Sequence, residues 1–152
     1  MGRRRLKTRK AISQDLGPIL EIMAIGSTAD HTDFIIHSVE AGKCLAALVS
    51  NKVAGFGILG TSLFFNREFI ELLVVHPEYR RRGIATALIR KMEAICPTKK
   101  LFTSTNESNI PAQKTYEANG FVRSGYIENL DEGDPEIIYF KRLAGTGMGG
   151  KK

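Results

Sequence analysis

The 152-residue sequence has only two cysteines, Cys44 and Cys96, and they lie far apart. Two cysteines are too few for a disulfide framework, and such a pair makes no metal site by itself. We therefore expect both to be small buried hydrophobic residues. The sequence also lacks any apolar run of the length that spans a membrane. These absences favour a cytoplasmic protein with no membrane partner and no metal.

Acidic residues are missing from residues 1–10, which contain six basic ones. From Ala11 onward the chain has 16 basic and 16 acidic residues, so the net charge of +6 comes from the start of the chain. We predict a basic flexible arm over residues 1–10. The glycine-rich end lacks apolar periodicity and predicts a flexible tail over residues 144–152. A globular domain is then expected over residues 11–143.

The familiar glycine-rich phosphate motifs are also missing. A P-loop needs the pattern G-x-x-x-x-G-K-[ST], which does not occur here. A dinucleotide fingerprint needs three glycines at a strand-to-helix turn, and the turn here has only Gly83. Neither of these nucleotide-binding classes is predicted.

Apolar patterning indicates a mixed α/β fold. Helical periodicity predicts helices over residues 13–26, 31–42, 84–96 and 109–120. Apolar runs predict strands over residues 43–50, 53–60, 68–75, 100–106, 121–130 and 136–143. Ser13 or Asp15 is a candidate cap of the first helix, and Asn51-Lys52 a candidate hairpin turn. The central strand–helix–strand unit implies a parallel pair of strands.

The turn within VVHPEYRRRGIATALI, residues 74–89, concentrates positive charge where a helix is expected to begin, at about Gly83. The first amides of a helix are unpaired and bind anions, and a glycine lets a phosphate approach the backbone. Three arginines would strengthen such a site. The alternative is that Gly83 only permits the turn while the arginines are solvated.

Two spaced motifs resemble those of the GNAT superfamily of N-acetyltransferases. The first is R-x-x-G-x-A, from Arg80 to Ala85. The second is N-x-x-A-x-x-x-Y-x-x-x-G-F, with Asn109, Ala112, Tyr116, Gly120 and Phe121 in place. The resemblance covers roughly residues 10–143. It implies a single GNAT-like domain with a mixed central sheet of about seven strands flanked by about four helices.

The resemblance also implies where acetyl-coenzyme A, the co-substrate, would bind. Amides from Arg81 to Thr86 would face the pyrophosphate, and backbone groups near Leu73–Val75 would pair with the pantetheine arm and polarise the thioester carbonyl. Asn109 would cap its helix and contact the same arm. The implied cofactor-binding residues are Leu73, Val74, Val75, Arg80, Arg81, Arg82, Gly83, Ile84, Ala85, Thr86, Asn109 and Tyr116.

The implied reaction is acetyl transfer to a primary amine, of a small molecule or a protein N-terminus, by direct attack on the thioester. Tyr116 is the candidate acid for the departing thiolate, and packing in the core is its alternative. Glu71 is the candidate base because a carboxylate in an apolar strand needs solvent or a partner, and an exposed face or an ion pair is its alternative. His76 is expected at the surface or behind the site, and His31 and His37 are expected to be structural.

The acidic stretch ENLDEGDPE, residues 128–136, would border the acceptor site in this family and attract a cationic amine. A solvated turn is the alternative. The rival function is a non-catalytic module that senses coenzyme A or docks its basic arm on nucleic acid. Nucleic acid is disfavoured because no aromatic residue interleaves the basic ones of the arm. A homodimer is possible, but the sequence identifies no interface.

Overall fold

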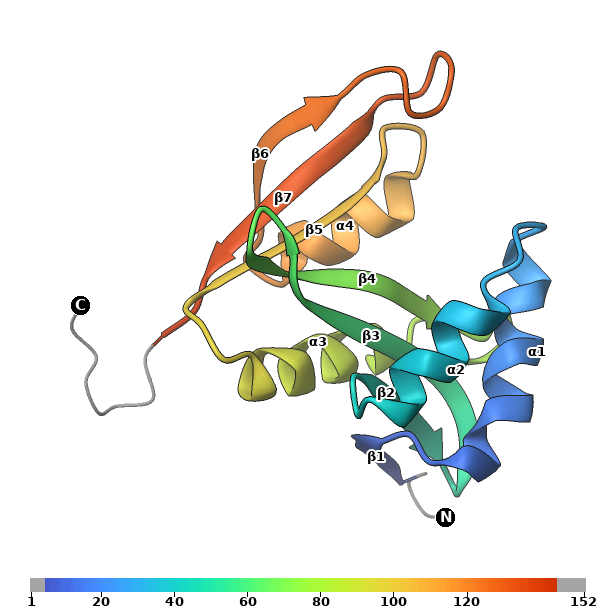
Figure 1. Ribbon diagram of the computed structural model, residues 1–152. Coiled ribbons are helices and arrows are strands. Elements are labelled where there is room, and N and C mark those ends of the chain that lie inside the picture. The colour runs from blue at the N-terminus through green and yellow to red at the C-terminus, as the bar shows by residue number, and fades with distance from the viewer. Residues whose placement is uncertain (1–4, 145–152) are drawn as a thin grey trace. The chain divides into compact units, whose positions relative to one another are not determined.

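The computed structural model describes residues 5–144, without the side chains of residues 62 and 63. Its seven strands are hydrogen-bonded in the order β1-β2-β3-β4-β5-β7-β6 (Figure 1). The strands are β1 (Leu6–Lys10), β2 (Cys44–Val49), β3 (Lys52–Phe64), β4 (Arg67–Val75), β5 (Lys100–Asn106), β6 (Val122–Ile127) and β7 (Glu136–Arg142). As predicted, β4 and β5 are parallel.

Four α-helices accompany the sheet in the described residues: α1 (Leu16–Gly26), α2 (Thr32–Glu40), α3 (Ile84–Ile95) and α4 (Ile110–Ala118). The mixed α/β fold class is thereby confirmed. In the described part of the chain, none of these helices combines the length and the apolar character needed to cross a membrane. The chain packs as two compact units. Unit 1 contains Met1–Leu59 and Glu71–Ala94, and unit 2 contains Gly60–Ile70 and Ile95–Lys152.

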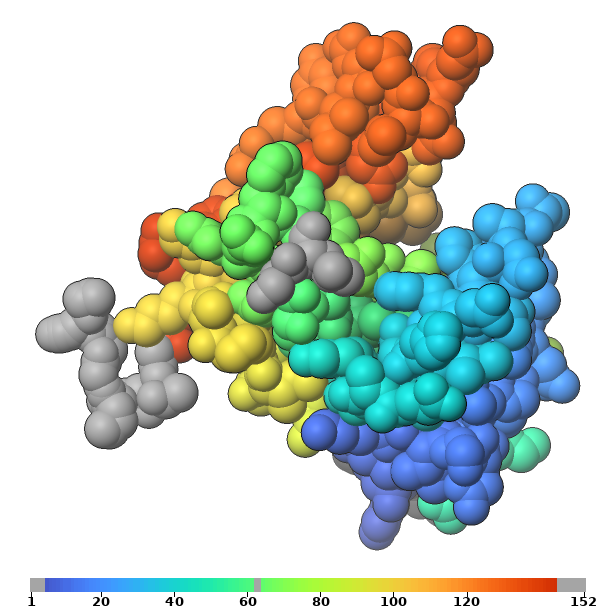
Figure 2. Space-filling view, viewed as in Figure 1, coloured from blue at the N-terminus to red at the C-terminus, as the bar shows by residue number. Residues whose placement is uncertain are grey.

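Unit 1 buries its core on one side of β2 and β3. Ile19 and Ile22 of α1 and Ile35 of α2 pack with Phe56 and Ile58 of β3. In Figure 1, α1 and α2 lie next to each other, and in Figure 2 they form the blue-to-cyan surface of this unit. Because successive strand residues point to opposite faces, the glycines that alternate with these core residues face the other side.

Gly55 and Gly57 face α3 on that other side. A Cβ on Gly55 would lie 2.9 Å from the carbonyl oxygen of Val74 and 3.3 Å from the Ile84 side chain. A Cβ on Gly57 would lie 2.9 Å from Cε of Met92. The two glycines therefore let β3, β4 and α3 approach one another more closely than any side chain would permit. This approach positions the end of β4 and the start of α3.

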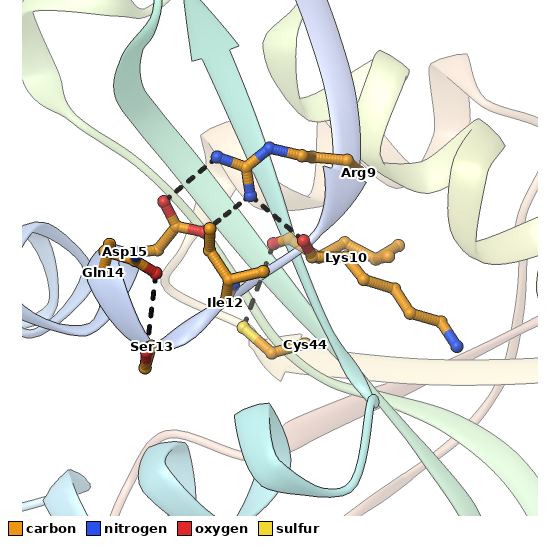
Figure 3. A network of polar contacts seen from close by, with 8 residues as sticks. Arg9, Lys10, Ile12, Ser13, Gln14, Asp15 and Cys44 are labelled. Atoms are coloured by element: carbon orange, nitrogen blue, oxygen red, sulfur yellow. Dashed lines mark hydrogen bonds and ion pairs between the residues drawn. The ribbon is translucent and has the colours of Figure 1, made fainter.

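The predicted flexible arm is corrected over Leu6–Lys10, which forms β1 and pairs antiparallel with β2. This strand lies at the edge of the sheet, where charged side chains are common. Its sequence therefore lacks the apolar pattern from which a strand is predicted. Arg9 donates to both carboxylate oxygens of Asp15, at 2.7 and 3.3 Å, and this ties β1 to the start of α1 (Figure 3). Residues 1–4 of the arm and residues 145–152 of the tail lie outside the described residues.

Asp15 also accepts a hydrogen bond from the Ile12 N–H at 2.8 Å. Asp15, one of the two predicted caps, occupies the N-cap position of α1, but its side chain makes no cap bond to the helix. Ser13 begins the short 3-10 turn, Ser13–Asp15, that precedes α1. The Asp15 carboxylate instead accepts hydrogen bonds from two residues that precede it in the chain, Arg9 and Ile12.

Cys44 lies close to these residues and is fully buried (Figure 3). Burial and the Asp15 charge raise the pKa of its thiol to about 12, as suits an inert core residue.

The hairpin between β2 and β3 turns one residue earlier than predicted. Ser50 and Asn51 have φ of 51° and 69°, and Lys52 already belongs to β3. Positive φ at both central residues is the geometry of a type I′ turn, whose twist matches that of the strands it joins. The sequence offered Asn51 as a signal but gave no sign that Ser50 would adopt this conformation.

Unit 2 is organised around β5, β7 and β6, which pair antiparallel in that order. Leu101, Thr103, Tyr116 and Tyr139 are buried, and the rings of Tyr116 and Tyr139 lie 5.6 Å apart. These contacts pack α4 on one face of the strands. The strand bond from Leu143 N–H to the Lys99 carbonyl, 2.7 Å, closes the end of the β5–β7 pair.

Candidate functional site

The end of β4 is fixed by a proline and a histidine. Directly after β4, the His76 N–H donates to the carbonyl of Ala54 in β3 at 2.8 Å. Pro77 has no N–H and cannot continue the ladder, so the chain turns through a short 3-10 helix, Pro77–Tyr79. His76 Nδ1 accepts from Glu78 N–H at 3.0 Å. His76 is thus a half-buried residue of the turn.

The three arginines that follow are exposed. The guanidinium of Arg82 lies 5.3 Å from the ring centre of Tyr79, and no ion pair involves Arg80, Arg81 or Arg82 within residues 5–144. Arg81 has a φ of 63°, a left-handed conformation that costs a non-glycine residue free energy. Backbone strain of this kind is often found at functional sites. Gly83 also has a positive φ, 79°, so two residues of this turn adopt a left-handed backbone conformation.

Gly83 is the residue on which α3 begins. Its carbonyl accepts the first helical bond from Ala87 N–H at 3.0 Å, so it occupies the N-cap position. The amides of Ile84 and Ala85 then have no acceptor within the helix. A Cβ added to Gly83 would meet nothing within 4 Å, so the space beside this backbone is open. An open cap, unpaired amides and three exposed arginines fit a multiply charged phosphate group.

Glu71, the candidate base, lies on β4 and is half-buried. Burial raises the pKa of its carboxyl. Leu72 and Val74 pack against the core formed with α1 and α2. By strand alternation Glu71, Leu73 and Val75 lie on the other face of β4. Glu71 and the implied contacts Leu73–Val75, together with residues 80–86, all belong to unit 1.

Asn109 caps α4, as predicted. Its Oδ1 accepts from the Ala112 N–H at 3.2 Å. Gln113, one turn along, is buried and was missed by the sequence reasoning. Its Nε2 donates to the carbonyls of Asn106 and Glu107, at 3.3 and 2.6 Å, and so holds the turn from β5 into α4. No sequence pattern singles out a glutamine for this role.

Tyr116 is buried, with 6% of its surface exposed, between the rings of Phe121 and Tyr139 at 5.7 and 5.6 Å. Burial raises the pKa of its hydroxyl, against the opposing effect of a hydrogen bond with Thr103. The packing alternative raised for Tyr116 is therefore realised in the structure, and its role as an acid stays a prediction. Asn109 and Tyr116 both belong to unit 2, whereas the phosphate turn belongs to unit 1.

Three carboxylates of the acidic loop between β6 and β7 tie the loop to β5 and to the turn that follows β5. Asp131 accepts from Asn106 Nδ2 at 2.8 Å, Asp134 from the hydroxyl of Ser108 at 2.6 Å, and Glu136 from that of Ser104 at 2.6 Å. Glu128 and Glu132 are exposed. The loop is thus largely a structured turn, and its attraction of a cationic acceptor remains a prediction.

The sequence matches the Acetyltransferase (GNAT) family over residues 14–121, which include both the arginine turn and α4. The chain belongs to this family. A solved GNAT-family acetyltransferase from Bacillus cereus is 42% identical, with a TM-score of 0.85 over 91% of this chain and 98% of that one. The family assignment made from the two motifs is thereby confirmed.

Other proteins are similar to this chain at lower identity or over a shorter stretch. The yncA protein of Salmonella typhimurium, solved with acetyl-CoA, is 17% identical, with a TM-score of 0.73 over 91% of this chain and 94% of that one. The N-alpha-acetyltransferase 30 of Xenopus laevis is 33% identical over 53% of this chain but only 32% of its own length. The mouse cysteine-rich protein 2-binding protein is 29% identical over 62% of this chain and 13% of its own length. The match therefore spans less than half of these curated relatives.

Proposed function

We propose that this protein transfers the acetyl group of acetyl-CoA to a primary amine by direct attack of the amine on the thioester. The observation that carries the proposal is the arginine turn: the Gly83 cap is open and the three arginines beside it are exposed. Gly83 and the amides of α3 would hold the pyrophosphate, with Arg80–Arg82 neutralising its charge. Bound acetyl-CoA would supply the activated acetyl group.

Leu73–Val75 would hold the pantetheine arm through backbone groups, and Asn109 would contact the same arm. An amide at the end of β4 would donate to the carbonyl oxygen of the acetyl group. The yncA protein, which shares this fold, was solved with acetyl-CoA, and this supports the choice of co-substrate.

An attacking amine must be neutral, although a free alkylamine has a pKa near ~10.4. Glu71 would take its proton, directly or through a water. Burial raises the pKa of Glu71, which makes its carboxylate a better base than an exposed one. A group of this kind accepts a proton only above its own pKa, so activity should fall as the pH drops through the raised pKa of Glu71.

Tyr116 would deliver a proton to the departing thiolate of coenzyme A. Burial raises the pKa of its hydroxyl, so the group keeps its proton at neutral pH and can donate it. The acceptor class that we propose is a protein or peptide N-terminus or a small amine. The relative named N-alpha-acetyltransferase 30 supports the first of these.

The test is release of the coenzyme A thiol from acetyl-CoA in the presence of an amine panel: peptides with free N-termini, spermidine and an aminoglycoside. Each peptide is paired with its N-acetylated form, which cannot react. The proposal expects thiol release with at least one free amine, a mass gain of one acetyl group on that amine, and none with the blocked form. Binding of acetyl-CoA without acetylation of any amine would instead assign the chain to a coenzyme A-binding module.

A further inference from the structure

A row of phenylalanines crosses one face of unit 2. The strand registers place Phe69 of β4 beside Phe102 of β5, Phe102 beside Phe140 of β7, and Phe140 beside Val122 of β6. The rings of Phe102 and Phe140 have their centres 5.2 Å apart. The row is therefore a continuous apolar band across four strands, which we call the phenylalanine band.

The band is extended by the hairpin between β3 and β4. The Phe64 ring lies 4.8 Å from that of Phe69 and 5.3 Å from that of Phe102. Phe65, at the turn, lies 4.9 Å from Phe64 and is 82% exposed. Phe65 thus extends the band to five phenylalanines and exposes its end to solvent. An apolar patch of this kind usually marks an interaction site.

The helix of unit 2 does not cover this band. The buried residues Leu101, Thr103 and Tyr139 point toward α4, and by strand alternation Phe102 and Phe140 point the other way. In Figure 1, α4 lies behind β5 and β7. Val122, at the end of the band on the edge strand, is 59% exposed.

Charge is distributed unequally on either side of the band. On one side of the band, two positions along each strand from its phenylalanine, the residues are basic: Arg67 of β4, Lys100 of β5 and Arg142 of β7. Lys100 is directly opposite Arg142 in the register. The Arg142 guanidinium lies 5.8 Å from the ring centre of Phe140, which places both on the same face. In the other direction lies Glu136, which the bond from Ser104 places on this face, followed by the acidic loop.

Arg142 and Glu136 stand at opposite ends of β7, about 20 Å apart at the rise of an extended strand. Tyr139 is midway between these two residues. A two-fold axis that lies in the plane of this face and crosses β7 at right angles near Tyr139 would place the Arg142 end of one copy over the Glu136 end of the other. It lays the apolar band of one copy on that of the other and sets the basic end of each copy against the acidic end of its partner. A face with these three zones is complementary to itself, as an isologous interface requires.

We propose that the phenylalanine band is the interface at which two copies of this chain associate, with Arg142 of each copy paired to Glu136 of the other. The apolar band provides the buried centre of the interface, and the charged ends fix its direction. All residues of this interface belong to unit 2, and its test measures the mass of the assembly rather than acetyl transfer.

The first experiment compares Val122→Arg with Tyr126→Arg by light scattering during size-exclusion chromatography at micromolar concentration. Both side chains lie on β6 and are about equally exposed, at 59% and 61%. Val122 pairs with Phe140 of the band, whereas Tyr126 pairs with Ile137 and points to the α4 side. The native chain and Tyr126→Arg should have twice the chain mass of 16.8 kDa, and Val122→Arg should have the monomer mass.

The second experiment reverses charge at each end of the band. Arg142→Glu alone and Glu136→Lys alone should each be monomeric, because both charged contacts of the pair become repulsive. An equimolar mixture of the two variants should associate, since each contact then joins opposite charges again. Thermal melting of each variant checks that it is folded, and restoration in the mixture excludes a folding defect as the cause.

A monomeric native chain would overturn the proposal. So would a Val122→Arg variant that stays dimeric, or a mixture of charge variants that fails to associate. Basic and aromatic side chains together can also bind single-stranded nucleic acid. A monomeric native chain that binds a labelled oligonucleotide, with loss of binding in Val122→Arg, would assign the band to that partner instead.

Discussion

At the scale of single residues, Tyr116 combines a packing role with a proposed chemical one. Its ring lies between Phe121 and Tyr139, and its hydroxyl bonds with Thr103. Tyr139 makes a useful comparison, since it is also buried and its hydroxyl donates to Glu117 Oε2 at 3.2 Å. Removing either hydroxyl leaves the ring in place and deletes its hydrogen bonding, which for Tyr139 also involves Arg123.

We predict that Tyr116→Phe and Tyr139→Phe each lower the free energy of unfolding by about 1 kcal/mol, the usual net value of a hydrogen bond. Only Tyr116→Phe should lower kcat, by about 100-fold, as expected for loss of a general acid. Urea unfolding and steady-state kinetics measure the two effects. Equal kcat for both variants would leave Tyr116 a purely structural residue.

Asp15 carries a prediction about pH. Burial raises the pKa of its carboxyl, but the bonds from Arg9 and from Ile12 N–H outweigh this, and the net pKa lies below its usual range. A lowered pKa in the folded state stabilises the protein above the pKa of the unfolded chain, and this contribution is lost as the pH falls through the folded value.

We therefore predict that Asp15→Asn lowers the free energy of unfolding at pH 7 by about 2 kcal/mol, because it leaves Arg9 without its partner. The gap to the native chain should begin to narrow as the pH falls below about 4, where Asp15 of the unfolded chain takes up a proton, and should close as the pH falls through the lower pKa of Asp15 in the folded state. Glu21→Gln, on the exposed surface of α1, is the control and should have little effect at either pH. A gap that is independent of pH would contradict this role of the Asp15 charge.

At the scale of elements, the approach of β3 to β4 and α3 depends on Gly55 more than on Gly57. An added Cβ at Gly55 would press on the backbone carbonyl of Val74, which cannot move without shifting β4. At Gly57 it would press on the flexible end of Met92, which can turn aside. Thermal or urea unfolding should therefore give Gly55→Ala a loss of about 3 kcal/mol and Gly57→Ala a loss of about 1 kcal/mol. Equal losses would contradict the contact with the Val74 backbone.

The elements also indicate how far the sequence can be interpreted alone. The strands were predictable from their apolar runs and the helices from their helical periodicity, and the two motifs located the arginine turn and α4. Strand β1 was not predictable, because Leu6–Lys10 is mostly charged and is a strand only through its pairing with β2. Burial of Tyr116 and the bonds of Gln113 arise from contacts between distant segments, which leave no local pattern.

At the scale of the whole molecule, the proposed acetyl transfer depends on the arginine turn, which would hold the pyrophosphate of acetyl-CoA. Calorimetric titration with acetyl-CoA tests this claim most directly, comparing the native chain with Gly83→Gln and Gly83→Glu. Because φ at Gly83 is 79°, both substitutions carry the same backbone strain, and they differ only in charge. We predict that the native chain binds, that Gly83→Gln binds more weakly, and that Gly83→Glu does not bind although it remains folded. Equal affinity for the Gln and Glu variants would contradict the claim.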